Sequence, residues 1–145
     1  MERQVIIRVI VERPPADVDF GVQEGHGNDY KTVQTQRWKK QDLRFEFPIR
    51  VKESKDGQPN FVGPFAQGPA NKRFIYLDIG IYAGQTNTPW SRRLKIPLTG
   101  ITWRMIEQAS DASSVIETRV PGTDRDGGPS CGTVKETSGW TLRNK

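Results

Sequence analysis

The stretch that decides the fold is residues 61–98, which read FVGPFAQGPANKRFIYLDIGIYAGQTNTPWSRRLKIPL. Within it, Arg73–Tyr82 alternates between two kinds of side chain, because Ile75, Leu77, Ile79 and Ile81 face one way and Phe74, Tyr76, Asp78 and Gly80 face the other. A period of two residues is the pattern of a β-strand with one face in the core. We expect the Ile/Leu face to be buried, and Tyr76 and Asp78 to face either solvent or a pocket.

The rest of the chain predicts further short strands and one helix. The strands are expected at Val5–Val11, Val18–Val22, Tyr30–Trp38, Leu43–Val51, Arg92–Leu98 and Val115–Val120, with a closing hairpin at Ser130–Leu142. Pro48 predicts an edge position or a bulge, and Asp56-Gly57 predicts a hairpin turn. An amphipathic pattern predicts a helix from Gly100 to about Ala109, with Thr99 as its N-cap.

These elements favour a mostly β (α+β) fold of one domain, residues 1–145. Seven to eight short antiparallel strands and one helix fit a sandwich or a partly open barrel. A chain of 145 residues is long enough for one domain with a real core.

Composition limits the compartment and the partners. The net charge of +5 permits an acidic partner without requiring one. Cys131 is the single cysteine, so the chain forms no internal disulfide, which fits a reducing cytoplasm. The N-terminal run MERQVIIRVIVER is interpreted as a strand and not as a signal peptide, and no stretch approaches the roughly 20 apolar residues of a membrane span. We therefore expect a cytoplasmic protein without a membrane contact.

The loop 121–132, PGTDRDGGPSCG, is the first candidate for a binding site. It places Asp124, Arg125, Asp126 and Cys131 among several glycines. Glycine lets a backbone approach a ligand closely, and turn amides can form a nest for an anion. The structural alternative is a turn that joins two strands, with carboxylates bonded to backbone amides.

Two segments of the central stretch are further candidates. The turn 63–69, GPFAQGP, would present Phe65 and Gln67 rigidly, or it is only a stiff connection across the end of a sheet. The segment that holds Arg92 and Arg93 suits carboxylate or phosphate recognition, but a charged, solvated edge strand gives the same pattern.

Other polar residues give weaker signals. His26, the single histidine, is interpreted as an exposed turn residue, and its pairing with Cys131 has no signature spacing. Asp17 and Asp19 would share a strand face, yet one of them is expected to cap the preceding turn. The sequence thus predicts no metal site and no cofactor. Basic residues are interleaved with acidic ones, so nucleic acid is not an expected partner.

Five segments together resemble a known family. They are VDFGVQ (18–23), FVGPFAQGP (61–69), RFIYLDIG (73–80), SRRLKIPLTGITW (91–103) and VPGTDRDGGPSCGTV (120–134). Their order and spacing resemble a family of small bacterial proteins described as a domain of unknown function. The resemblance implies a bacterial, cytoplasmic protein of one domain, and it supplies no activity and no functional residue.

Three hypotheses of function follow from these observations. The first is a non-catalytic module that binds a small anionic ligand, with its site drawn from Gln67, Tyr76, Asp78, Arg92, Arg93, Asp124, Arg125 and Asp126. The second is a small hydrolase or isomerase that uses Asp78, Asp124 or Asp126 for acid–base chemistry beside an arginine. The third is a protein-interaction module or homodimer, formed through the edge of strand Tyr30–Trp38.

Overall fold

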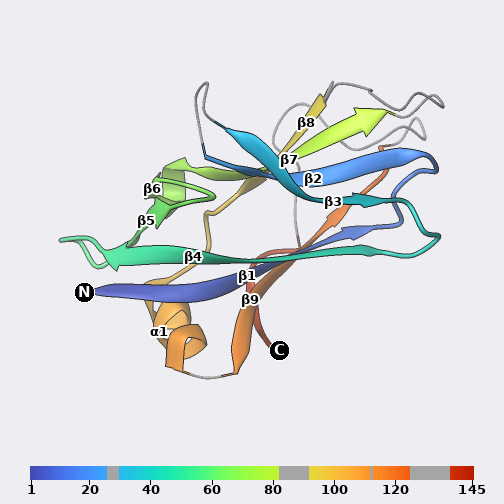
Figure 1. Ribbon diagram of the computed structural model, residues 1–145. Coiled ribbons are helices and arrows are strands. Elements are labelled where there is room, and N and C mark those ends of the chain that lie inside the picture. Colours follow the sequence, from blue (N-terminus) through green and yellow to red (C-terminus); the bar gives the residue numbers. More distant parts are fainter. Residues whose placement is uncertain (26–29, 82–91, 112, 125–137) are drawn as a thin grey trace.

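The computed structural model describes residues 1–25, 30–81, 92–111, 113–124 and 138–145 (Figure 1). Its strands are β1 (Glu2–Glu12), β2 (Val18–Glu24), β3 (Lys31–Arg37), β4 (Leu43–Glu53), β5 (Pro59–Gly63), β6 (Gly68–Pro69), β7 (Phe74–Ile81), β8 (Arg92–Pro97), β9 (Ser114–Pro121) and β10 (Thr141–Asn144). The helices are α1 (Trp103–Asp111) and a short 3-10 helix, η2 (Ala70–Lys72). The mostly β composition with one α-helix is as predicted.

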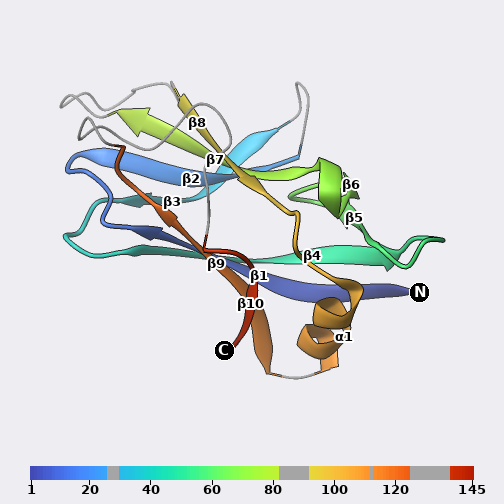
Figure 2. The same ribbon diagram turned by 180° about the vertical axis from the view of Figure 1, so that it is seen from behind.

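The strands form two sheets that face each other. The six-stranded sheet has the order β10-β9-β1-β4-β5-β6, and the four-stranded sheet has the order β3-β2-β7-β8. All neighbours are antiparallel, as predicted, except β1 and β9, which are parallel. Figures 1 and 2 show the two layers from opposite sides. In the described part of the chain the sheets do not close into a barrel, so the sandwich is the alternative that the structure supports.

The core lies between the sheets and follows the predicted alternation. Strand β4 alternates strictly between buried and exposed positions from Leu43 to Val51. Its buried residues meet Ile75, Leu77 and Ile79 of β7 in one hydrophobic cluster, and all three are fully buried. Burial of this apolar surface is the main favourable term that holds the sheets together.

Pro48 lies in β4 where, among the described residues, one side of the strand has no neighbouring strand. Strand β4 pairs with β1 along its length, but with β5 only near its end. The carbonyls of Arg44 and Glu46, which share the alternation of Pro48, accept hydrogen bonds from the side-chain amides of Gln36 and Gln34 at 2.6 and 2.9 Å. Since backbone groups two residues apart point to the same side, the N–H that Pro48 lacks would have pointed to this open side. Pro48 therefore lies at a local edge of β4, although β4 is an inner strand in the order of the sheet.

The helix begins later than predicted. Gly100 has φ of +102°, which is outside the helical region, and α1 starts at Trp103. Thr102, and not Thr99, is the N-cap, because its Oγ1 accepts a hydrogen bond from the backbone N–H of Met105 at 3.2 Å. Ile106 and Ala109 are buried in the core cluster, so α1 packs on the sandwich as expected. No helix among the described residues has the length and apolar character needed to cross a membrane.

The sequence predicts two connections, a hairpin turn at Asp56-Gly57 and a closing hairpin at Ser130–Leu142. The Asp56-Gly57 hairpin is confirmed, with Gly57 at φ +81° and the Ser54 N–H donating to the Gln58 carbonyl at 2.9 Å. The hydroxyl of Ser54 and the backbone N–H of Gln58 bond the carboxylate of Asp56 and lower its pKa below the ordinary value. The predicted closing hairpin stays a prediction, because its first arm, residues 130–137, lies outside the described residues; the residues after its turn form β10, which pairs with β9.

A row of charges crosses the outer face of the six-stranded sheet. Arg8 on β1 is opposite both Glu46 on β4 and Glu117 on β9. Its Nε lies 3.0 Å from Glu46 and its Nη1 lies 3.1 Å from Glu117, and the side chains of Arg8 and Glu117 are each only 7% exposed. Arg119 and Arg143 also approach Glu117, at 3.8 and 3.6 Å. A charge buried this deeply is tolerated only when it is paired.

We expect Arg8→Ala to destabilise the protein strongly. The substitution leaves Glu117 buried with only its two longer ion pairs, and removal of one partner of a buried pair costs about 3–5 kcal/mol. Arg50→Ala is the matched control, because its ion pair with Glu2 is exposed and 3.8 Å long, which predicts a loss below about 1 kcal/mol. Urea unfolding followed by circular dichroism measures both, and equal losses in the two variants would contradict this account.

Candidate functional site

Asp78 is a buried carboxylate on the face of β7 that points away from the core. It is only 2% exposed. The hydroxyl of Thr32 on β3 donates to its Oδ2 at 2.6 Å, and Nε of Arg93 on β8 lies 3.5 Å from its Oδ1. Both carboxylate oxygens therefore have a partner, which is what a buried charge requires.

Gly21 makes the contact between Thr32 and Asp78 possible. Strand β2 lies between β3 and β7, and Gly21 is directly opposite Asp78. A Cβ at Gly21 would lie closer to Cγ2 of Thr32 than real Cβ atoms approach their neighbours. The absence of a side chain at Gly21 thus lets Thr32 reach across β2 to the carboxylate.

Arg93 is held on three sides. Besides the Asp78 carboxylate, its guanidinium carbon lies 5.0 Å from the ring centroid of Tyr76 and 5.4 Å from that of Tyr30. Both distances are within the range of a cation–π interaction. Asp78, Arg93, Thr32, Tyr30 and Tyr76 form one group, which we call the Asp78 cluster.

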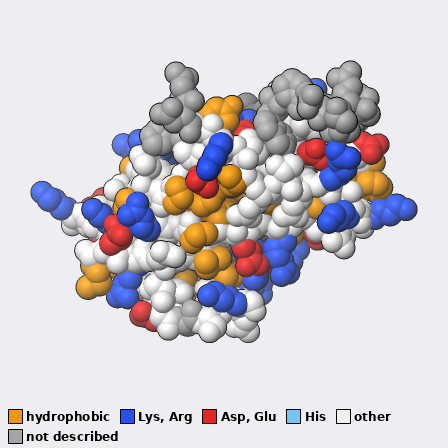
Figure 3. Space-filling view, viewed as in Figure 1, with side chains coloured by type: hydrophobic (Ala, Val, Ile, Leu, Met, Phe, Trp, Pro, Cys, Tyr) orange, Lys and Arg blue, Asp and Glu red, His pale blue; other side chains and the backbone are white. Residues whose placement is uncertain are grey.

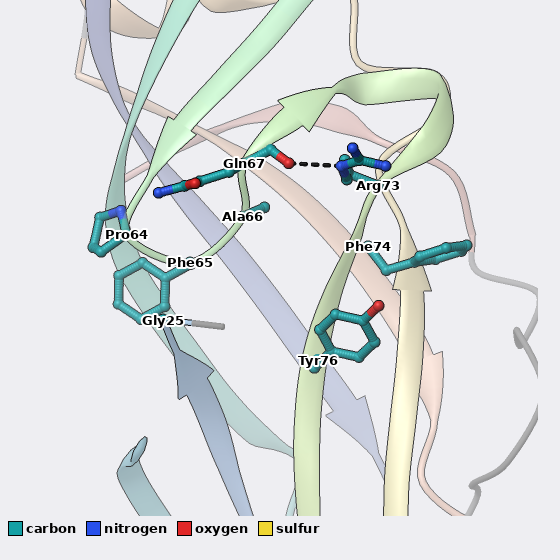
Figure 4. A pocket seen from close by; sticks show the side chains of 8 residues that line it. All are labelled: Gly25, Pro64, Phe65, Ala66, Gln67, Arg73, Phe74 and Tyr76. Atoms are coloured by element: carbon teal, nitrogen blue, oxygen red, sulfur yellow. Dashed lines mark hydrogen bonds between the residues drawn. The ribbon is translucent and has the colours of Figure 1, made fainter. Parts of the chain in front are cut away.

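A cavity of about 430 Å³ lies beside Tyr76 (Figure 4). The described residues that line it are Gly25, Pro64, Phe65, Ala66, Gln67, Arg73, Phe74 and Tyr76. One wall comes from the turn after β5 and the opposite wall from the beginning of β7, as Figure 4 shows. The N–H of Gly25 at the end of β2 donates to the carbonyl of Pro64 at 2.9 Å, which links the four-stranded sheet to the turn.

Local packing fixes the walls of this cavity. The ring of Phe65 packs on Phe47 of the core with centroids 4.3 Å apart. Arg73 donates from Nε to the carbonyl of Gln67 at 2.7 Å and from Nη1 to that of Lys72 at 3.2 Å. A Cβ at Gly68, whose φ is +122°, would collide with Nε of Arg73, so this guanidinium lies where only glycine leaves room.

Three side chains bring hydrogen-bonding capacity to the cavity. Arginine has five N–H donors, and Arg73 uses two of them on backbone carbonyls, which leaves three. Within the described ranges the hydroxyl of Tyr76 and the side-chain amide of Gln67 have no hydrogen-bond partner in the protein. The cavity therefore combines apolar walls with a cation, an amide and a hydroxyl, which is the usual composition of a small-molecule site.

The structure brings only some of the sequence candidates together. Gln67 and Tyr76 line one cavity, and Asp78 and Arg93 lie next to it in the cluster that shares Tyr76. Arg92 is exposed at the start of β8, opposite Ile79. Four further candidates lie outside the described residues, namely Arg125, Asp126, His26 and Cys131.

Asp124 lies at the other end of the sandwich. Gly122 and Thr123 bond the carbonyls of Glu12 and Arg13, where β1 ends, at 2.7 Å each. That end of β1 pairs with the first residues of β4, whereas β5, which leads into the cavity turn, pairs with the last. The described part of the 121–132 loop therefore does not converge with the 63–69 turn, and the expected meeting of the two loops does not occur there.

The remaining carboxylate candidates, Asp17 and Asp19, lie before and on β2. Asp19 on β2 pairs with Arg37 on β3 at 3.1 Å, and Asp17 precedes β2 with φ of +60°. In the part of the chain that the structure describes, no three His, Cys, Asp or Glu side chains gather as a metal site.

Basic and acidic side chains are interleaved on the face drawn in Figure 3. The expectation about nucleic acid stays a prediction.

Arg73, the cation of the cavity, is not among the site residues that the sequence predicts. The alternation predicts Arg73 only as the first residue of a strand, and Phe74 as part of that strand's polar face. The available signal is the pair of glycines that bracket PFAQ in GPFAQGP, because such a turn can fold back on the residues that follow it. Gly21 cannot be singled out from the sequence, since its role depends on which strands flank β2.

The model of one protein family matches nearly the whole chain. The model of a family of unknown function, DUF5990, matches residues 5–143, and the chain belongs to this family. The resemblance to a domain of unknown function is thus confirmed. No curated protein and no solved structure matches the chain.

We expect Gly21→Ala to destabilise the protein through its clash with Thr32. Overpacking of this kind costs about 1–3 kcal/mol. Thr32→Ser removes Cγ2 and keeps the hydroxyl, so Gly21→Ala should cost about 1 kcal/mol less in that background, a coupling typical of residues in contact. Denaturant unfolding of the four proteins in this double-mutant cycle measures the coupling, and strictly additive losses would rule out the role assigned to Gly21.

Proposed function

We propose that this member of the DUF5990 family binds a small anionic ligand in the cavity between the 63–69 turn and β7. The observation that carries the proposal is the guanidinium of Arg73, which is oriented by two backbone carbonyls and retains three N–H donors at the rim of the cavity. Because Arg73 is already oriented by two backbone carbonyls, a ligand would not have to immobilise it, which lowers the entropic cost of binding.

The charge of the cavity supports an anion over a cation. Arg73 is charged, and none of the other seven described residues that line the cavity carries a carboxylate. The buried carboxylate of Asp78, two residues after Tyr76 on β7, is already paired with Arg93 and bonded by Thr32. A ligand cation would therefore meet the Arg73 charge without compensation, whereas an anion would form a charge-assisted hydrogen bond.

The Asp78 cluster supports the cavity in this proposal. Arg93 bridges Asp78 and the ring of Tyr76, so it connects the buried carboxylate to a cavity wall. An acid–base role for Asp78 would need at least one oxygen that is open to a substrate, and both oxygens are engaged. The enzyme hypothesis therefore has less support from the geometry than the binding hypothesis.

We also infer that the protein is bacterial, that it is located in the cytoplasm, and that its partner is a small molecule. The single cysteine supports a reducing compartment, and the resemblance noted in the sequence supports a bacterial source. The alternative of a homodimer through the edge of β3 has less support, because Gln34 and Gln36 of that strand already bond carbonyls of β4.

We expect Arg73→Gln to weaken the binding of small anions at least about tenfold, which corresponds to about 1.4 kcal/mol. Acetate, benzoate and phosphate would each be titrated into the ¹⁵N-labelled protein, and the amide shifts would be fitted to a Kd. The variant should fold normally, since Arg73 is exposed.

Lys72→Gln is the matched control, because Lys72 is the neighbouring cation and does not line this cavity. It should leave the Kd unchanged. Equal weakening in both variants would mean that binding depends only on overall charge. Shifts that cluster away from residues 64–76 would place the anion elsewhere and overturn the proposal.

A further inference from the structure

We propose, resting on the function inferred above, that the ligand is a flat aromatic ring that bears a single carboxylate. Phe65 and Pro64 lie on one side of the cavity and Tyr76 and Phe74 on the other (Figure 4), and we call the space between them the slot. Three of the eight lining residues are aromatic. Aromatic rings favour offset-stacked or edge-to-face contacts with another ring over contacts with a saturated group of the same size.

Both walls of the slot are held in place from behind. Phe65 is 6% exposed and packs on Phe47 of the core. Tyr76 contacts Arg93, which Asp78 anchors. The rings of Tyr76 and Phe74 lie near each other, with centroids 6.2 Å apart. Walls that are fixed before the ligand arrives favour a rigid, planar ligand, since a flexible one would lose rotamer freedom without a better fit.

The charge of the slot fits one carboxylate. The guanidinium of Arg73 is planar and lies at the rim, where Figure 4 places it above Phe74 and Tyr76. Its three remaining N–H groups match a carboxylate better than a tetrahedral dianion, because Arg73 is the one cation among the described residues that line the slot, and a phosphate would keep a second charge uncompensated.

The size and the other polar groups narrow the ligand class further. A volume of about 430 Å³ is at the lower end of ligand cavities, which suits an acid of one or two rings. The hydroxyl of Tyr76 and the amide of Gln67 are available for a ring hydroxyl or carbonyl substituent. Hydroxybenzoate-like and indole-carboxylate-like acids have this chemistry.

The test compares ligands that differ in one property each. Benzoate, cyclohexanecarboxylate, benzylamine and phosphate would be titrated into the full-length ¹⁵N-labelled protein, with Kd values from amide shifts. Benzoate should bind about 2- to 10-fold more tightly than cyclohexanecarboxylate, which has the same charge and a similar size but is not flat. Benzylamine should not bind, and phosphate should bind more weakly than benzoate.

Two variants separate the ring from the charge. Phe74→Leu should remove most of the preference for benzoate over cyclohexanecarboxylate, and Arg73→Gln should weaken both acids alike. Circular dichroism confirms that each variant is folded. Val62→Leu is the control, because Val62 is half-buried on β5 and does not line the slot, so both Kd values should stay unchanged.

The outcomes distinguish this inference from the function on which it rests. Equal affinity for the two acids, or tighter binding of phosphate, would overturn the aromatic carboxylate and leave the anion site intact. Failure of all three anions to shift residues 64–76 would overturn both. Retention of the benzoate preference in Phe74→Leu would also contradict the inference, because the ring contact would then not be its source.

Discussion

The carboxylate of Asp78 is the constraint on which the site depends. It is buried on the outer face of the four-stranded sheet, where a charge without partners would be strongly destabilising. The sequence satisfies it with Thr32 from one edge strand and Arg93 from the other, and Gly21 keeps the strand between them clear. One carboxylate thereby ties together all four strands of this sheet.

Each outer face of the sandwich holds a buried charge, and the two charges are paired in different ways. On the six-stranded sheet, Arg8 is buried between Glu46 and Glu117 on the two neighbouring strands. Each of these three charged side chains therefore has an oppositely charged partner. On the four-stranded sheet, Arg93 extends from the buried carboxylate to the ring of Tyr76 at the cavity wall. The first arrangement connects strands only, whereas the second also connects a buried carboxylate to a wall of the cavity.

The strands are predictable because periodicity is local, whereas the site is only partly predictable because it depends on strand order. Alternation in β1, β4 and β7 is visible in the sequence, and so is the hairpin at Asp56-Gly57. The pairing of Gly21 with Asp78 follows from the order β3-β2-β7-β8, which no short segment encodes. Arg73 carries no local signal of its own, since its guanidinium reaches the cavity only through the fold of the turn.

The most direct test of the cavity as an anion site is a crystal structure of the protein with 4-bromobenzoate, in which the anomalous signal of bromine locates the ring. We expect bromine density in the slot between Phe65 and Tyr76, with the carboxylate on the guanidinium of Arg73. Bromine density beside Arg92 or Arg93 with an empty slot would contradict it.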